Sequence, residues 1–385
     1  MSRHLRTIAV SALTLAALLW SQQTSQVPSS PRGQRWTAAQ SQSWYANEPW
    51  LVGSNYIPAY AANELEMWQA DSFDPKRIDQ ELGWAESLGM NTMRVFLHNL
   101  LWDQDAAGFK QRIDTFLRIC DKHHIRPILV LFDSCWDPFP KLGKQPAPRP
   151  GIHNSRWVQS PGAKVLEDPS QYPRLAEYVK GIVGAFAHDR RVLAWDIWNE
   201  PDNTNEGSYA ASDPPNKVQL VLALLPQAFA WARTAAPDQP LTSGVWHGDW
   251  SDPAKLEPMP KEQLELSDIT SFHNYGVPNE FEKAVRSLQP YGRPIICTEY
   301  MARGRNSTFQ GILPIAKQDK VGAINWGFVQ GKTQTYLPWD SWQHPYVYHA
   351  PAVWFHDIFY PDGRPYRPAE VAFIRQMTGR AHSEP

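Results

Sequence analysis

The sequence has few cysteines, and none of them stands in a pattern that marks a metal site or a disulfide framework. Only Cys120, Cys135 and Cys297 occur in 385 residues. An odd number of widely separated thiols allows at most one disulfide and has no metal-ligand spacing. We therefore expect Cys120 and Cys297 to be buried free thiols.

The chain also lacks an excess of charge of either sign. Lys and Arg number 37 against 39 for Asp and Glu, so no basic footprint points to nucleic acid or to an acidic membrane surface. No glycine-rich phosphate loop follows a predicted strand, and no His/Cys/Asp/Glu cluster has a spacing that demands a metal. We expect an uncharged partner, no cofactor, no stable membrane partner and, by default, a monomer.

Long hydrophobic runs are absent except near the N-terminus. Basic residues within the first six positions precede an apolar run over residues 8–20, and Ser/Gln/Pro-rich sequence follows. This order is typical of a secretory signal over 1–21 followed by a flexible linker over 22–42. The run is shorter than the roughly 20 residues that span a bilayer, although an uncleaved anchor is the alternative. We expect a secreted or periplasmic protein whose catalytic domain occupies 43–385.

Short apolar runs alternate with helical patterns from about residue 50 onward. Several runs are nearly continuous Val, Ile, Leu and Phe, which is typical of parallel strands that are covered on both faces. Eight strands are predicted, over residues 51–56, 91–97, 127–132, 192–198, 241–246, 269–275, 294–298 and 323–329.

The segments between these strands carry apolar residues at spacings of three and four, as amphipathic helices do. One stripe runs from Ile78 to Leu88 and stops at Gly89, a typical helix-ending residue. Others run over residues 113–120 and 175–186. Eight strands with interleaved helices predict the α/β class and a single (β/α)8 TIM barrel, with a doubly wound open sheet as the alternative. No internal repeat or second domain is evident.

Two insertions are long for a compact domain, and loops of this length are usually functional. The first covers residues 134–173 and is rich in proline, with Trp136 and Trp157. The second covers residues 330–351 and contains Trp339, Asp340, Trp342 and several tyrosines. In a barrel both would lie at the C-terminal ends of the strands, where active sites are built. We expect them to wall a cleft, and their flat aromatic faces suit sugar rings as well as ordinary cores.

Two glutamates stand at the ends of predicted buried strands. Glu200 ends the fourth strand and Glu299 the seventh. A carboxylate is costly to place there unless it is paired or has a function, although salt-bridged loop carboxylates are common. Paired carboxylates are the chemical groups of glycoside hydrolysis. The two positions therefore predict one shared active site.

The residues around the two glutamates resemble a known group of enzymes. Trp-Asn-Glu-Pro at 198–201 and Thr-Glu-Tyr at 298–300 resemble the acid/base and nucleophile signatures of clan A glycoside hydrolases, the retaining (β/α)8 enzymes. The resemblance is strongest to the cellulase-like family five, with the catalytic barrel of family two as a neighbour. It spans the chain from about Trp50 to the C-terminus.

This resemblance implies a role for each matched residue. Glu200 matches the acid/base, Glu299 the nucleophile and Asn199 the asparagine that contacts the sugar 2-hydroxyl. Substrate-site matches on the other strands are Arg94 near the nucleophile, the His-x-Tyr pair His273 and Tyr275 with its tyrosine donating to the nucleophile, and Trp326 as the aromatic floor. Taken singly, Arg94 and Tyr275 would be interpreted as structural, but a barrel brings all of them to one mouth.

The third strand departs from the family pattern. Many relatives carry a histidine near its end, where this chain reads Leu-Phe-Asp-Ser-Cys-Trp at 131–136. Asp133 and Trp136 could substitute for it, or Asp133 could only cap the following loop. Further possible sugar contacts after other strands are His98, Asn99, Trp246 and His247, with Asn55 and Tyr56 as either cleft or strand-exit residues.

The prediction is a secreted retaining β-glycosidase that acts on a β-linked polysaccharide or oligosaccharide of the cellulose, mannan or xylan type. Glu299 would attack the anomeric carbon while Glu200 protonates the leaving oxygen. Three alternatives stay open: a catalytically silent carbohydrate-binding barrel, a transglycosylase with the same covalent step, and a barrel whose carboxylates bind metal. The sequence does not distinguish internal from terminal cleavage.

Overall fold

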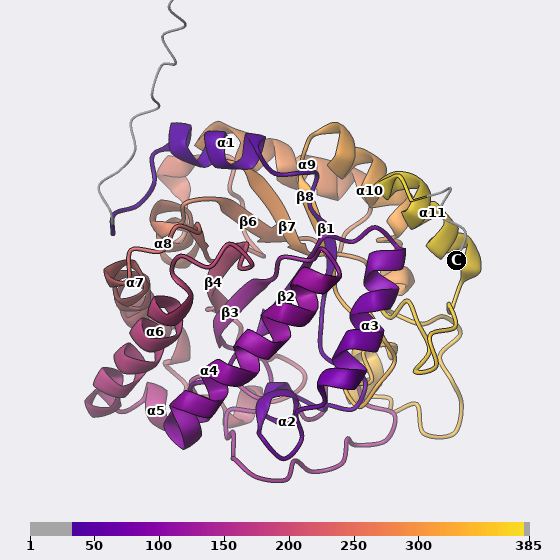
Figure 1. The fold of residues 1–385 in the computed structure, drawn as a ribbon, viewed down its shortest axis with the longest axis horizontal. Helices are drawn as coiled ribbons and strands as arrows, with labels where there is room; N and C mark the ends of the chain where they lie inside the picture. The colour runs from indigo at the N-terminus through magenta and orange to yellow at the C-terminus, as the bar shows by residue number, and fades with distance from the viewer. Residues whose placement is uncertain (1–32, 381–385) are drawn as a thin grey trace, which may run out of the picture.

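The computed structural model describes residues 33–380 and has the predicted barrel architecture (Figure 1). Its eight strands pair in the order β5-β4-β3-β2-β1-β8-β7-β6, and every pairing is parallel. The bounds are β1 Val52–Asn55, β2 Thr92–Phe96, β3 Ile128–Asp133, β4 Ala194–Asn199, β5 Leu241–Thr242, β6 Thr270–His273, β7 Ile295–Glu299 and β8 Gly322–Asn325. All eight predicted strands are present, so the open-sheet alternative is excluded.

The barrel closes weakly between β5 and β6. Strand β5 is much shorter than predicted, because the Ser243 amide donates to the Ser267 side chain at 3.1 Å and leaves the ladder. A single bridge between Val245 and Phe272 then joins the two edges. The barrel is therefore nearly closed, with its gap on the β5–β6 side.

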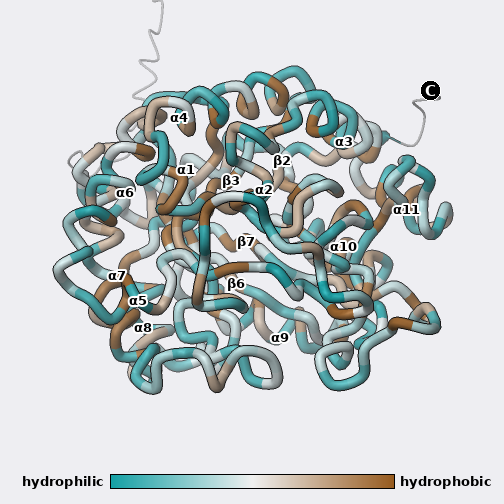
Figure 2. The backbone as a smooth tube through the Cα atoms, turned by 90° about the horizontal axis from the view of Figure 1, so that it is seen from below, coloured by the Kyte–Doolittle hydropathy of each residue, from teal (hydrophilic) through white to brown (hydrophobic). Residues whose placement is uncertain are grey.

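Helices surround the strands as a ring, as the view along the barrel shows (Figure 2). Their bounds are α2 Glu64–Trp68, α3 Pro75–Ser87, α4 Asn99–Lys122, α5 Ala163–Leu166, α6 Tyr172–Phe186, α7 Lys217–Thr234, α8 Pro258–Leu266, α9 Pro278–Leu288, α10 Phe309–Gln318 and α11 Pro368–Thr378. The predicted stripes form the buried faces of α3, α4 and α6. Helix α3 shows why the pattern worked, since Asp74 caps its first turn and Gly89 follows its end at φ 72°.

An additional helix, α1 (Ala38–Ala46), closes the N-terminal end of the barrel. Trp44 and Tyr45 pack against the apolar layer that the strand starts form there, and Arg35 donates to two backbone carbonyls near the end of α8. In Figure 1 this helix lies at the end of the barrel opposite the long loops. The predicted flexible linker over residues 22–42 overlaps this helix, because residues 38–42 are helical and the buried Ser41 hydroxyl donates to the Asp268 carbonyl. The predicted signal, 1–21, lies outside the described residues.

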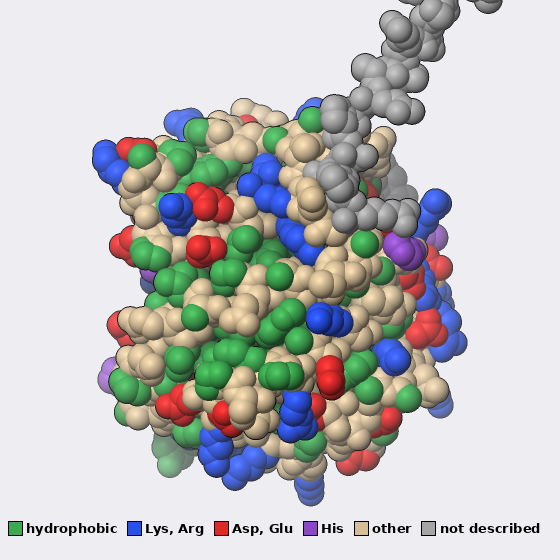
Figure 3. All heavy atoms as spheres, turned by 90° about the vertical axis from the view of Figure 1, so that its left-hand side faces the viewer, with side chains coloured by type: hydrophobic (Ala, Val, Ile, Leu, Met, Phe, Trp, Pro, Cys, Tyr) green, Lys and Arg blue, Asp and Glu red, His purple; other side chains and the backbone are tan. Residues whose placement is uncertain are grey.

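The outer surface carries charges of both signs. Lys and Arg side chains are interspersed with Asp and Glu on the face shown in Figure 3. Within residues 33–380, none of the helices is long and apolar enough to cross a membrane. All three cysteines are free and buried, as predicted for Cys120 and Cys297.

A buried ion pair ties the region after β8 to the barrel. Arg303, just after β7, donates to both carboxylate oxygens of Glu370 on α11 at 2.7 to 3.0 Å. Its guanidinium also donates to the backbone carbonyls of Trp354 and Asp357. The segment that follows β8 is thereby anchored between α11 and β7.

We predict that Glu370→Ala lowers the free energy of unfolding by roughly 3–5 kcal/mol, because it leaves the buried Arg303 charge without its partner. Urea denaturation monitored by tryptophan fluorescence measures this change. The control is Glu282→Ala, which breaks the exposed Glu282–Arg286 pair of α9 and should cost no more than about 1 kcal/mol. Equal small losses for both variants would contradict the anchoring role of Glu370.

Candidate active site

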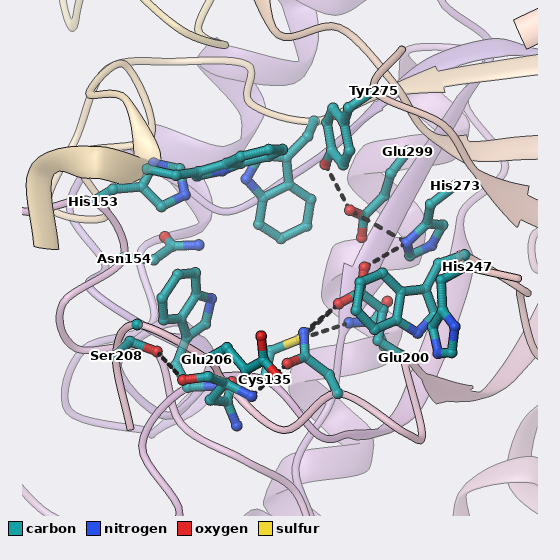
Figure 4. Close-up of a pocket in the computed structure, with 18 of the residues that line it drawn as sticks. Cys135, His153, Asn154, Glu200, Glu206, Ser208, His247, His273, Tyr275 and Glu299 are labelled. Atoms are coloured by element: carbon teal, nitrogen blue, oxygen red, sulfur yellow. Dashed lines mark hydrogen bonds and ion pairs between the residues drawn. The ribbon is translucent and has the colours of Figure 1, made fainter. Parts of the chain in front are cut away.

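A cavity of about 950 Å³ opens at the C-terminal ends of the strands (Figure 4). Both predicted glutamates line it, together with the long loops after β3 and β8. Its lining includes the predicted residues Asp133, Trp136, Asn199, Glu200, Trp246, His247, His273, Tyr275, Glu299 and Trp326. A cavity of this size can hold a ligand of a few sugar units.

The two glutamates face one another across the cavity floor. Glu200 directly follows β4 and has a left-handed backbone (φ 42°), whereas Glu299 is the last residue of β7. One carboxylate oxygen of each lies within 4.8 Å of the other and of a ring nitrogen of His273. The side chains predicted to share one site are thus brought together by the barrel.

Arg94 on β2 holds the nucleophile candidate. Its fully buried guanidinium donates to Glu299 Oε1 at 2.9 Å and to Asp196 Oδ2 at 2.9 Å. It also donates to Asn55 Oδ1 at 2.9 Å and to Asn199 Oδ1 at 2.7 Å. One side chain therefore connects β1, β2, β4 and β7 beneath the cavity.

Different donors hold the Glu200 carboxylate. Asn203 Nδ2 donates to Oε2 at 2.6 Å, and the Cys135 thiol lies 3.3 Å from the same oxygen. His273 Nδ1 lies 2.8 Å from Oε1 and 3.5 Å from Glu299 Oε2. Neutral donors surround Glu200, whereas a guanidinium contacts Glu299.

This difference separates the two carboxyl groups chemically. Burial raises the pKa of Glu200, and the hydrogen bonds from Asn203 and Cys135 oppose this effect. Burial also raises the pKa of Glu299, but Arg94 and the Tyr275 hydroxyl stabilise its carboxylate, while the charge of Glu200 raises the pKa further. Because two close carboxylates resist double ionisation, we assign the shared proton to Glu200 and the charge to Glu299.

His273 and Tyr275 are held as neutral donors. Burial lowers the pKa of His273 to about 4, so its ring is uncharged at neutral pH. Because carboxylate oxygens face Nδ1, that nitrogen carries the proton. Tyr275 donates to Glu299 Oε2 at 2.6 Å, and burial holds its pKa well above the usual value. Both predicted side chains therefore orient the glutamates.

A metal ion could be coordinated by the carboxylate oxygens of Glu200 and Glu299 and by a ring nitrogen of His273. However, Arg94, Tyr275 and Asn203 already donate to their carboxylate oxygens. Donors aimed at these oxygens fit a proton-transfer pair better than a cation site. The absence of a cofactor therefore stays a prediction.

The remaining predicted contacts divide into those that reach the cavity and those that do not. Trp326 lines it and packs edge-on against Phe96 and Trp157. Trp246 and His247 line it as well, and both bind Asp202, at 2.6 and 2.7 Å. These positions fit the predicted sugar contacts.

The prediction of a sugar contact is wrong for His98. Its side chain is fully buried, accepts from the Leu100 amide at 3.1 Å to cap α4, and contacts the Gln159 carbonyl. Asn99 is buried against Ser160. Proximity to a strand end does not decide whether a side chain points into the mouth or starts the next helix.

Asn55 and Tyr56 likewise lie behind the site. Asn55 accepts from Arg94, and Tyr56 donates to Glu81 at 2.8 Å in the core. Asp133 does cap the following loop, at Cys135 N, but it also accepts from Asn199 Nδ2 at 2.9 Å and from Trp157. Asp133 therefore both caps the loop after β3 and lines the cavity.

Several residues of the site were not found from the sequence. Asp202 and Asn203 follow Glu200 after Pro201, so the polar residues after Glu-Pro are the signal that the sequence offers. Cys135 contacts Glu200, and no motif around this thiol in the sequence indicates that contact. His153 and Asn154 lie in the middle of a long loop, where no periodic pattern points to a cavity.

Comparison with known families gives one match over most of the chain. The model of the family described as cellulase (glycosyl hydrolase family 5) matches residues 54–344. This range contains both glutamates and the whole cavity lining. Among curated proteins, none matches this sequence.

Solved structures show the same fold at low sequence identity. The exo-β-1,4-mannosidase Op5Man5 from Opitutaceae bacterium strain TAV5 is 20% identical at a TM-score of 0.55, and the match covers 87% of this chain and 60% of that one. The hyperthermostable endo-1,4-β-D-mannanase from Thermotoga petrophila RKU-1 is 12% identical at a TM-score of 0.52, and the match covers 86% of this chain and 99% of that one. A glycoside hydrolase family 5 mannosidase from Rhizomucor miehei is 13% identical at a TM-score of 0.51, and the match covers 87% of this chain and 94% of that one. The chain thus spans less than two thirds of Op5Man5.

We predict that Arg94→Met lowers the free energy of unfolding at pH 7.5 by roughly 3–5 kcal/mol, because Asp196 and Glu299 lose their buried partner. Burial raises the pKa of both carboxyl groups, so they take up protons as the pH falls and the penalty should shrink at pH 4.5. Chemical denaturation at the two pH values measures it. The exposed Arg118→Met serves as control, and a penalty that grows on acidification would contradict this account.

Proposed function

The chain belongs to glycosyl hydrolase family 5, and we propose that it is a secreted enzyme that hydrolyses β-linked oligosaccharides or polysaccharides with retention of configuration. The observation that carries this proposal is the separation of the two glutamates. Their nearest carboxylate oxygens lie within 4.8 Å, whereas retaining enzymes place the groups about 5 to 5.5 Å apart and inverting ones roughly 6.5 to 9.5 Å apart. This short separation supports the retaining mechanism over direct displacement by water.

In the first step, the Glu299 carboxylate attacks the anomeric carbon and forms a covalent ester with the sugar. The bond from that carbon to the glycosidic oxygen breaks, and the leaving oxygen takes the proton of Glu200. Arg94 and Tyr275 each bind one oxygen of Glu299, so they orient the carboxylate for attack. Tyr275 Oη remains a donor to it because its pKa is raised.

In the second step, Glu200 acts as a base. It removes a proton from water, whose oxygen attacks the same carbon, and the ester bond to Glu299 breaks. Glu200 thereby regains its proton and Glu299 its charge. Two inversions at one carbon give overall retention.

The surrounding residues supply the substrate contacts. The exposed face of Trp326 can stack on the sugar at the cleavage point, since flat aromatic faces match the apolar faces of sugar rings. Asn199 is fixed by Arg94 and Asp133, and its remaining amide hydrogen faces the Cys135 sulfur at 3.4 Å. Sulfur is a weak acceptor, so a sugar 2-hydroxyl can take its place.

The structural neighbours that are described as mannosidase and mannanase make β-mannosides the first substrates to test, with β-glucosides next. Secretion is part of the proposal because of the basic residues and apolar run that precede the described chain. An acceptor sugar in place of water would make the same first step a transglycosylation, which product analysis separates.

We predict that Glu299→Ala reduces turnover of a 2,4-dinitrophenyl β-glycoside on the order of 10⁴-fold or more, because no covalent step remains. Added azide should restore turnover in part and yield the α-glycosyl azide, since azide then displaces the leaving group directly. Proton NMR of the product identifies its configuration.

The matched variant is Glu200→Ala, which keeps the nucleophile. With azide it should yield the β-glycosyl azide, because azide then attacks the covalent intermediate in place of water. If both variants gave the same anomer, or if Glu299→Ala hydrolysed normally, the two assignments would be wrong.

We predict that Asn203→Ala shifts the alkaline limb of the pH profile of kcat/KM upward. Asn203 and Cys135 donate to the Glu200 carboxylate and lower its pKa, so removing a donor raises that pKa and keeps the acid protonated to higher pH. Cys135→Ala should shift the limb in the same direction by less. Initial rates between pH 4 and 10 measure both.

The control is Cys120→Ala, which removes another buried thiol but leaves Glu200 untouched. Its profile should match that of the wild type. A downward shift for Asn203→Ala, or a shift confined to the acid limb, would contradict the assignment of Glu200 as the acid.

A further inference from the structure

The two long loops of the active-site face are bonded into one wall, which we call the loop wall and define as residues 149–154 and 333–346. Gln334 Nε2 donates to two backbone carbonyls of the first segment at 2.7 and 2.8 Å. His153 Nδ1 lies 2.9 Å from the Leu337 carbonyl oxygen, and His153 is buried. Buried bonds of this kind give the wall a defined shape.

Aromatic rings brace the loop wall from the cavity side. Trp136 stacks on Trp342 with ring centroids 5.3 Å apart and planes 9° apart, and the Arg149 guanidinium lies over the Trp342 ring at 5.5 Å. Both tryptophans line the cavity. The stacking and the cation–π contact hold the two rings in place, so a ligand does not easily displace them.

The loop wall lies on one side of the cavity. Its first segment follows β3 and its second follows β8, and the sheet order places β2 and β1 between those strands. The opposite side, beyond β4 and β5, ends in His247, whose side chain is 42% exposed. Figure 4 shows His153 and Asn154 across the cavity from His247.

The inner face of the loop wall presents polar groups without partners. Asn154 is 1% exposed and lines the cavity, yet neither its amide nitrogen nor its amide oxygen has a hydrogen-bond partner. The indole nitrogen of Trp342 is also buried and unpaired. Figure 4 shows the Asn154 amide directed into the cavity. Because unsatisfied buried groups are costly, these donors and acceptor point to a ligand with hydroxyl groups.

The position of the acid tells which end of the substrate meets the loop wall. Glu200 accepts from Asn203, and the neighbouring Asp202 binds Trp246 and His247 on the open side. The leaving group must lie beside the acid that protonates it. The leaving group therefore extends to the open side, and the glycone lies between the glutamates and the loop wall.

Resting on the proposed function, we infer that this enzyme acts on chain ends: the loop wall stops the glycone, and Asn154 and the Trp342 indole N–H bind hydroxyls of the non-reducing-end sugar. Hydrolysis then releases a product of one short, fixed length from that end. An internal segment of a polysaccharide cannot pass through the closed side.

The first test uses the wild-type protein and β-1,4-linked mannohexaose and cellohexaose that carry a fluorophore at the reducing end. Early in the reaction we expect one unlabelled short product and one labelled remainder. Labelled fragments of several lengths, or a short labelled product, would overturn the inference while leaving hydrolysis intact. If no β-linked substrate were cleaved, the proposed function would fail as well.

The second test compares Asn154→Ala with Asn47→Ala, which changes an exposed asparagine beside α1 at the other end of the barrel. Asn154→Ala should lower kcat/KM on the substrate that is cleaved by about tenfold, because the lost hydrogen bonds are to uncharged hydroxyls. The loss should disappear on a substrate whose terminal sugar lacks the contacted hydroxyl, tested with a series of monodeoxy glycosides. An equal loss on every member of the series would show a structural effect and overturn the assignment of Asn154.

Discussion

The buried guanidinium of Arg94 is the interaction on which the active site depends. It contacts Glu299, Asp196, Asn55 and Asn199, which come from three different strands. A fully buried charge is tolerated only where its partners have good geometry. The register of β1, β4 and β7 relative to β2 is therefore coupled to the position of the nucleophile. Stability and catalysis share one network here.

That network makes two chemically identical side chains different. Glu299 has a guanidinium and a phenol as donors, whereas Glu200 has an amide, a thiol and an imidazole. The first set favours a carboxylate and the second tolerates a carboxylic acid. The left-handed backbone at Glu200 turns its side chain toward the cavity just as β4 ends. Such local strain is characteristic of functional positions.

The two ends of the barrel have different roles: the base is closed by apolar packing, and the mouth carries the active site. At the base, Trp44 and Tyr45 of α1 cover an apolar layer, and this packing needs no particular chemistry. At the mouth, the loops after β3 and β8 bond to each other, and Thr335 of the second loop donates to Asp357 in the segment that Arg303 anchors. A barrel that is rigid at its base can hold a loop wall on one side of its mouth and leave the other side open. The length of substrate on each side then follows from loop contacts rather than from the catalytic residues.

The sequence by itself determined the strands, the amphipathic helices and the two glutamates, because these depend on local periodicity and on polar residues that interrupt buried runs. It also identified Arg94, His273, Tyr275 and Trp326 through their resemblance to a family. Only the tertiary structure decided that His98 caps a helix, that Trp44 and Tyr45 of α1 close the barrel base and that Asn154 faces the cavity. Each of these depends on which partner a side chain meets from a distant part of the chain. Periodicity carries no information about such long-range contacts, so the chemistry could be predicted and the shape of the cleft could not.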